Sequence, residues 1–212
     1  MVSFCLVVED RSRTSTGFFG RTWVNTELRA HLTMDHQQII DFWFVEIEPA
    51  QWWRHDDDFD HLIAEKFGAL HARALQCELY KWRVHPLGRL AEIIVLDQFS
   101  RNIYRGTARA FAADPLALAL AQEAVATKAA AALAPRHRAF LYMPYMHSES
   151  RQIHEIAVGL FSEHGLEASL DSEVKHKAII DRFGRYPQRN VILGRIADAE
   201  EREFLKAPRS SS

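Results

Sequence analysis

The sequence predicts an all-α protein, built as an array of antiparallel helical hairpins. From residue 35 onward, apolar side chains recur at spacings of three and four residues, the period of an amphipathic helix. Capping residues, prolines and glycines separate these segments at short intervals, and no alternating β-branched run occurs. Short connections favour neighbouring helices that run antiparallel. The pattern alone is compatible with a degenerate solenoid or an irregular bundle.

Three helices are predicted in the first half of the patterned region. The first covers residues 35–46, and the aromatic residues within 42–53 are expected to anchor it to the core, or else to form a ligand-stacking wall. The second helix covers 57–80. The third opens at Pro86 and ends at Gly106, which supplies a left-handed position after the last turn. Because the third helix is apolar on both flanks, it should lie in the interior of the array.

The second half predicts further helices with clear boundaries. They cover residues 114–133, 136–143, 148–164 and 171–183, with a last helix from Asp198 onward. Asp114 is expected to be the N-cap of its helix, and Pro144 is expected to interrupt the next one. Gly165 and Gly184 close the two helices that follow.

The composition is that of a single globular domain with two flanking segments. The chain has 212 residues, of which 48% are hydrophobic and 25% are charged. Residues 1–33 lack a sustained period, so we expect a poorly structured N-terminal extension, a single all-helical domain over 34–207, and a disordered tail over 208–212.

Charge and cysteine content exclude several classes of function. A formal net charge of −2 argues against a globally basic nucleic-acid binder. No run approaches the roughly 18 apolar residues that a membrane span needs. Cys5 and Cys77 form no disulfide framework, which predicts reduced thiols and a cytoplasmic location, and Cys77 is expected to be a small core residue.

Charged residues lie on a helical stripe that should face the core. On a helical projection of the third helix, Asp97 and Arg101 share a face with Leu90 and Ile93. Burying an unpaired charge costs several kcal/mol, so these residues must pair or serve a site. They are four residues apart and can pair along the helix. The alternatives are a buried ion pair that fixes helix docking and a functional site.

Two later helices break the same rule. Glu149 projects with Ile153 at the start of its helix, and His147 comes just before it. His176 lies on the apolar face of the helix that follows. Each histidine alone could be a hydrogen-bonded core residue. Because buried polar groups must satisfy one another, we expect Asp97, Arg101, Glu149 and His176 to converge.

The segment from Phe183 to Arg195 is rich in permanent positive charge. Arg185, Arg189 and Arg195 are close together in the sequence, and Asn190 adds an amide. Guanidinium groups match carboxylates and phosphates with two parallel hydrogen bonds, so this loop could clamp an anion. Alternatively, it locks the C-terminal helices to acidic residues of the core.

No motif identifies a cofactor or a metal. Phosphate-binding loops, dinucleotide-binding glycine motifs and nucleophile elbows are absent from the sequence. The acidic run at residues 55–58 could bind a metal, but acids at a helix start are commoner. A metal at His147, Glu149 and His176 is conceivable, although their spacing is not diagnostic. We therefore predict no metal and no cofactor.

Several blocks of sequence resemble a known family. They are LDQFSRNIYRG at 96–106, FLYMPYMHSE at 140–149 and H-x-x-II-x-RFGRYP-x-RN at 176–190. The chain resembles the bacterial domain of unknown function 924 over about residues 35–206. The resemblance implies a tetratricopeptide-like right-handed superhelix and no particular activity. Family members usually carry FPHRN, where this chain has Tyr186 and Gln188.

Three hypotheses follow for function. In the first, a polar pocket binds a small anionic ligand or an acidic peptide end. In the second, a hydrolase or transferase uses histidine as general acid or base with Glu149 aligning it. In the third, the protein is a scaffold whose buried charges are architectural. The candidate catalytic residues are His147, Glu149 and His176, and the candidate ligand-binding residues are Asp97, Arg101, Asn102, Arg185, Arg189 and Asn190.

Overall fold

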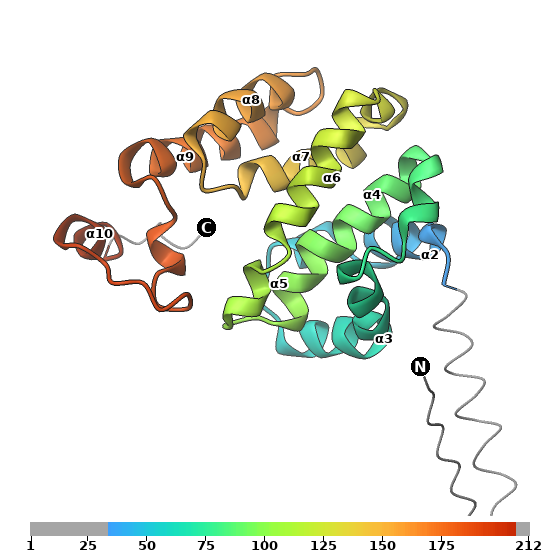
Figure 1. Cartoon of the computed structure of the whole chain (residues 1–212), viewed down its shortest axis with the longest axis horizontal. Coiled ribbons are helices and arrows are strands. Elements are labelled where there is room, and N and C mark those ends of the chain that lie inside the picture. The colour runs from blue at the N-terminus through green and yellow to red at the C-terminus, as the bar shows by residue number, and fades with distance from the viewer. Residues whose placement is uncertain (1–33, 207–212) are drawn as a thin grey trace, which may run out of the picture. The chain divides into compact units, whose positions relative to one another are not determined.

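The structure, a computed structural model, describes residues 34–206, and the helices it contains confirm the predicted all-α class (Figure 1). No strand occurs in this range. The helices are α2 (His36–Asp41), α3 (Asp57–Leu75), α4 (Pro86–Ile94), α5 (Ser100–Ile103), α6 (Asp114–Ala126), α7 (Pro135–Met146), α8 (Arg151–Phe161), α9 (Glu167–Phe183) and α10 (Ala199–Phe204). The predicted extension over 1–33 and tail over 208–212 lie outside the described residues.

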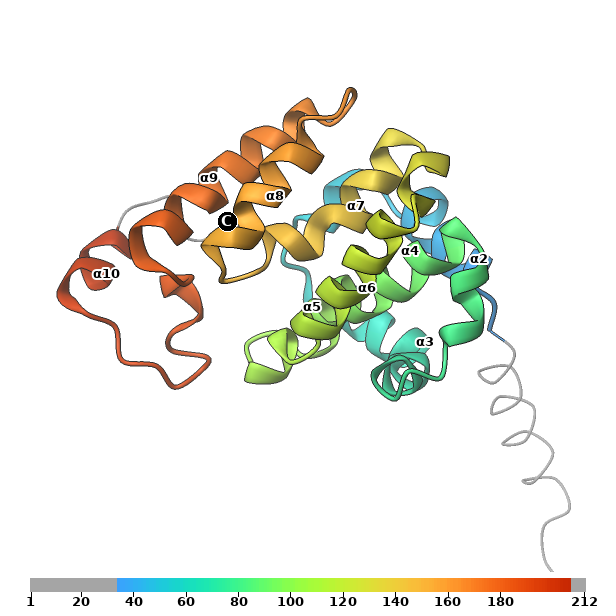
Figure 2. The same ribbon diagram turned by 45° about the horizontal axis from the view of Figure 1, so that its top comes forward.

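Neighbouring helices pack as hairpins around one central helix. In two views α8 and α9 lie side by side, joined by a short turn, and α8 also packs on α7 (Figure 2). α4 contacts α2, α6 and α7, so it is covered from several sides. Leu90, Ile93 and Val95 are fully buried, which confirms the interior position expected for this helix. Among the described helices, none is long and apolar enough to cross a membrane.

A π-helical turn interrupts the central helix. α4 continues without a break into η4 (Val95–Phe99), a π-helical segment, and then into α5. A π turn holds more residues than an α turn, so side chains beyond it point away from the stripe that an ideal helix predicts. Asp97 and Gln98 lie within this turn and are both buried.

The first aromatic segment anchors the N-terminal helices to the core, as predicted. Phe42 and Trp43 are buried in a second π-helical turn, η1 (Phe42–Glu46). Trp52 donates its indole N–H to the backbone oxygen of Trp43 at 2.9 Å. Trp53, in contrast, is 67% exposed, so the cluster ends at the surface.

Several helix boundaries differ from those predicted. Pro144 does not interrupt α7, which continues to Met146. Every residue from 140 to 146 is buried, and this burial outweighs the single hydrogen bond that proline removes. α8 begins at Arg151, so Glu149 precedes the helix, and α9 begins earlier than predicted, at Glu167.

The buried face of α8 is not the one predicted. His154, Ala157 and Phe161 are fully buried, whereas Ile156, placed on the predicted inner stripe, is 45% exposed. The polar side chain of His154 occupies the core because α9 supplies it with a buried acidic partner, Glu173. The pattern of apolar residues could not reveal this face, because one of the residues buried on it is a histidine.

Cys77 is not a core residue, contrary to the prediction. It is exposed and adopts a φ of 58°, in the left-handed region, where α3 ends. A residue with a Cβ is strained there, so Cys77→Gly should raise the free energy of unfolding by about 0.5–1 kcal/mol. Urea denaturation measures the change. Cys77→Ala removes the thiol but keeps the Cβ, and an equal gain in that variant would rule out the conformational explanation.

Candidate functional site

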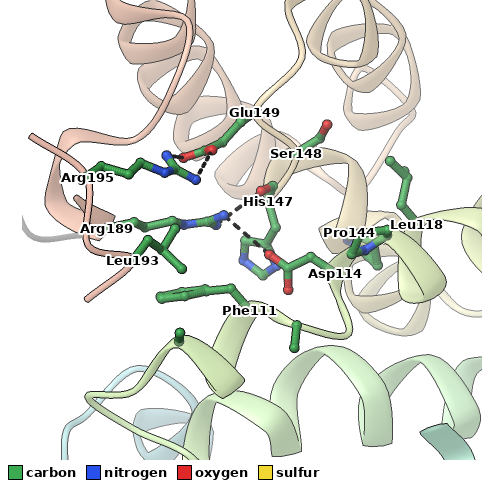
Figure 3. Close-up of a pocket in the computed structure, with 13 residues that line it drawn as sticks. Phe111, Asp114, Leu118, Pro144, His147, Ser148, Glu149, Arg189, Leu193 and Arg195 are labelled. Carbon is green, nitrogen blue, oxygen red and sulfur yellow. Dashed lines mark hydrogen bonds and ion pairs between the residues drawn. The ribbon is translucent and has the colours of Figure 1, made fainter. Parts of the chain in front are cut away.

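A cavity of about 460 Å³ lies where α6, α7 and the C-terminal loop meet (Figure 3). Its walls come from η5 (Ala108–Phe111), the first turn of α6, the end of α7, the link 147–149 and the segment 189–195. The ionisable residues that line it are Asp114, His147, Glu149, Arg189 and Arg195. Residues far apart in the chain therefore meet at one site.

A chain of alternating charges starts behind the wall of this cavity and reaches its lining at Asp114 and Arg189. Asp97 is buried and forms an ion pair with Arg101, in which Oδ1 of Asp97 lies 3.1 Å from Nη1 of Arg101. Arg101 also binds both carboxylate oxygens of Asp114, at 3.0 and 3.2 Å. Arg189 reaches the same carboxylate at 3.3 Å. Asp114 thus lies between two guanidinium groups.

Asp114 occupies a different position in its helix from the one predicted. It was expected to be an N-cap, but the N-cap is Ala113 and Asp114 is the first residue of α6. Its carboxylate therefore points to the arginines and not to its own helix backbone, since it accepts no cap hydrogen bond. A lone aspartate at a helix start carries no sequence signal that separates these two roles.

Arg189 lies between two aromatic rings at the cavity wall. Its guanidinium carbon is 4.6 Å from the ring centroids of both Phe111 and Tyr186, and the group donates to the backbone oxygen of His147 at 3.1 Å. Burial lowers the pKa of Arg189, and the charge of Arg101 adds to this effect against the opposing charge of Asp114. The carboxylate nearest to Arg189, that of Asp114, is shared with Arg101, and the charge of Glu149 adds a smaller favourable effect.

The pKa of Arg101 is shifted in the opposite direction from that of Arg189. It is also buried, and burial disfavours its charge, but Asp97 and Asp114 together raise its pKa above the ordinary value. Arg101 is accordingly a structural cation with two carboxylate partners. This separates it from Arg189, although the sequence placed both in one anion-binding set.

His147 is oriented by Asp97. Its Nδ1 lies 2.8 Å from Oδ1 of Asp97. Burial opposes ionisation of this aspartate, but Arg101 and His147 hold its pKa well below the usual range. Burial also lowers the pKa of His147, assisted by Arg101. A neutral imidazole beside an ionised carboxylate must place its proton on Nδ1, which leaves Nε2 as an acceptor.

Glu149 lines the cavity but does not align the histidine. It accepts two hydrogen bonds from Arg195, at 3.0 and 2.7 Å, and one from the backbone N–H of Tyr186 at 2.8 Å (Figure 3). Burial raises the pKa of Glu149, but the hydrogen bonds of Arg195 and Tyr186 outweigh it and lower the pKa overall. Glu149 therefore fastens the C-terminal loop to the link between α7 and α8.

Two further candidates lie away from the cavity. Nδ1 of His176 is 2.8 Å from the backbone oxygen of Ser172 in its own helix, and its ring centroid is 5.7 Å from that of Tyr186. Asn102 donates to Asp60 at 2.7 Å. Neither residue lines the cavity. Of the four residues expected to converge, Glu149 lines it, Asp97 and Arg101 bind lining residues from behind, and His176 is absent from it.

The remaining candidates stabilise the C-terminal segment. Arg185 binds both carboxylate oxygens of Glu201, at 2.6 and 2.8 Å, and the hydrogen bond from Arg185 contributes most to lowering the pKa of Glu201 to about 2. Asn190 is fully buried beside this carboxylate. The alternative that this segment locks helices to acidic residues therefore fits Arg185 and Asn190, whereas Arg189 lines the cavity.

A buried acid–base pair, which was not predicted from the sequence, lies behind the cavity. Nδ1 of His154 lies 2.6 Å from Glu173, and both side chains are fully buried. Nε2 of His154 faces the backbone oxygen of Ser148 at 2.9 Å. Both ring nitrogens therefore face oxygen acceptors, and the pair is structural, because neither side chain is exposed.

A cluster of possible metal ligands lies on another face. His55, Asp57 and Asp60 offer ligand atoms within 4.8 Å of one another in the described range. The carboxylate of Asp60, however, is already bound by Asn102 and Arg105. The cluster therefore carries no metal assignment.

Comparisons with known proteins agree with the fold and leave the chemistry open. A family model described as a bacterial protein of unknown function, DUF924, matches residues 39–209. The chain belongs to this family. A solved structure of a protein of unknown function from Agrobacterium tumefaciens is 36% identical to this chain and superposes on it with a TM-score of 0.77. The match covers 81% of this chain and 96% of that one. No curated protein matches the sequence.

Proposed function

We propose that the cavity binds a small anionic molecule and that Arg189 is the residue that recognises it. One observation carries the proposal: Arg189 lines the cavity while sharing its carboxylate partner, Asp114, with Arg101. The side chain of Arg189 is only 11% exposed and shares its carboxylate partner, so a bound anion would give it a partner of its own. A carboxylate or phosphate supplies acceptors that fit the guanidinium fork.

The shape of the cavity supports a ligand with a short apolar part. A volume of about 460 Å³ is typical of sites for small molecules. Phe111, Leu118 and Leu193 provide apolar walls beside the polar floor. The carboxylates of Asp114 and Glu149 would repel an anion placed elsewhere, so they restrict its charged group to the side of Arg189.

The cellular setting forms part of the same proposal. We propose a cytoplasmic location, which the exposed free thiol of Cys77 supports, because such thiols persist in reducing compartments. The ligand would then be a soluble metabolite or the acidic end of a peptide. A cavity of this size favours the metabolite.

Anion binding should raise the melting temperature. At 100 times its dissociation constant, a ligand stabilises by about 2.7 kcal/mol, which corresponds to roughly 5–10 °C for a domain of this size. We expect such a shift with phosphate or succinate, measured by differential scanning fluorimetry against chloride at equal ionic strength. Arg189→Gln should abolish the anion-specific shift.

A matched variant separates binding from general charge effects. Arg182→Gln removes an exposed arginine from α9 and should leave the anion-specific shift unchanged. If phosphate and succinate give no shift beyond that of chloride in the wild-type protein, the pocket charges are architectural and the scaffold hypothesis holds.

A further inference from the structure

One nitrogen atom in the cavity has no hydrogen-bond partner among residues 34–206. Nδ1 of His147 is bound to Asp97, but Nε2 has no hydrogen bond to any described residue. It is not among the buried polar atoms that lack partners, so it is accessible to solvent. His147 lines the cavity, and its side chain is 16% exposed. Nε2 is therefore an oriented acceptor open to a bound molecule.

Burial is the main cause that keeps this nitrogen in its basic form, against the charge and hydrogen bond of Asp97, which favour a second proton. Asp97 is 1% exposed and fixes the tautomer with the proton on Nδ1. Arg101 and Asp114 are the other charged groups that act on the ring, with Arg101 disfavouring a second proton and Asp114 favouring one. Arg189 is bound to the backbone oxygen of the same residue, so an anion at Arg189 lies beside the imidazole.

We propose that Asp97 and His147 form a proton-accepting dyad that acts on the anion held at Arg189. The molecule would carry a carboxylate or phosphate for Arg189 and present an O–H group to Nε2. In the step, that O–H bond breaks, a bond forms between the proton and Nε2, and the negative charge stays on oxygen. Asp97 stabilises the imidazolium ion that results. His147 is then the catalytic base and Asp97 a positioning residue.

The inference rests on the proposed function, and alkylation tests both separately. Iodoacetate carries a carboxylate and a reactive carbon, whereas iodoacetamide is its neutral counterpart. Attack by Nε2 forms a nitrogen–carbon bond and releases iodide. We expect peptide mass spectrometry of the full chain to show carboxymethylation of His147 about tenfold faster than carbamidomethylation, because the carboxylate is bound first. His164, which is fully exposed, provides an internal reference.

Two variants assign the roles of the neighbouring residues. Arg189→Gln should remove the preference for iodoacetate and leave the slower reaction with iodoacetamide unchanged. Asp97→Asn presents an amide that donates to Nδ1, which moves the ring proton to Nε2, so alkylation there should fall at least about tenfold.

A pH profile of the wild-type protein gives an independent test that does not depend on a variant that folds. From pH 8 to pH 6, the reaction of a blocked histidine in solution falls about fourfold, because its ring becomes protonated with a pKa near 6.5. The reaction of His147 should fall by less than that of the blocked histidine, since burial lowers its pKa. Asp97→Asn, where it folds, should change this profile as well as the rate.

The outcomes distinguish the two proposals. Equal reaction of His147 with both reagents, faster than at His164, would leave the dyad standing and overturn recognition of the anion by Arg189. An intact anion-specific melting shift, with His147 no more reactive than His164, would overturn the dyad and leave anion binding standing.

Discussion

Glu173→Ala should lower the free energy of unfolding by about 3–5 kcal/mol, because removing one partner of a buried ion pair leaves the other without compensation. Glu173 and His154 are both fully buried and lie 2.6 Å apart. Once the carboxylate is removed, Nδ1 of His154 is left buried without its hydrogen-bond partner. Guanidinium chloride denaturation measures the change.

A matched substitution and a double variant complete this test. Glu203→Ala removes a carboxylate that is 73% exposed and should alter stability by less than about 0.5 kcal/mol. His154→Leu combined with Glu173→Leu should destabilise by less than the sum of the single changes, since neither partner is left unpaired. Similar effects of Glu173→Ala and Glu203→Ala would contradict the structural role of the pair.

His71 should make the protein sensitive to acid. Burial, with the charge of Arg109 adding to it, lowers the pKa of His71 from 6.5 to about 4. Its Nε2–H is bonded at 2.7 Å to Ser100, whose hydroxyl donates to the backbone oxygen of Leu96. Nδ1 is buried without a partner among the described residues. Protonation would therefore place a charge where nothing accepts its hydrogen.

The sign of the effect follows from the two pKa values. Because the pKa is lower in the folded state, the unfolded chain binds an additional proton as pH falls from 6.5 towards 4. Stability is lost across that window, by about 3 kcal/mol at pH 4, and no further loss from this group occurs below it. Well above pH 6.5 the ring is neutral in both states and contributes no pH dependence.

Comparing variants isolates this contribution from other titrating groups. His71→Gln keeps an N–H donor for Ser100 and cannot become charged, so its unfolding free energy should fall less steeply between pH 7 and pH 4. His164→Gln is the matched substitution at a fully exposed side chain and should leave the wild-type profile unchanged. If the unfolding free energies of His71→Gln and the wild type fall in parallel with decreasing pH, His71 is not the cause of the loss of stability in acid.

The helical class was predictable because it depends on local spacing, whereas the exact ends of helices were not. Gly184 adopts a positive φ of 69° and closes α9 as predicted, since that conformation is a property of glycine itself. Pro144 was misread because the fate of a proline depends on what its helix packs against. The buried face of α8 was misread because Glu173, the partner that makes a buried histidine stable, comes from another helix.

The candidate site was partly visible in the sequence. Asp97 and Arg101 were identified because charges on an apolar stripe require partners, and these residues do bind His147 and Asp114, which line the cavity. Asp114 was missed because its shared carboxylate becomes apparent only when α6 meets the C-terminal loop. Arg185 was grouped with Arg189 because proximity in sequence does not show which arginine already has a dedicated carboxylate.

The π turn within the central helix constrains how this region can change during evolution. Leu90 and Ile93, before the turn, are fixed in the core, while Arg101 and Asn102, after it, are bound to Asp114 and Asp60. Deletion of one amino acid between Val95 and Phe99 would restore a regular helix. The side chains that follow would then rotate by about 100° about the helix axis. Insertions and deletions here should therefore be rarer among related sequences than substitutions, because length sets which partners the two halves can meet.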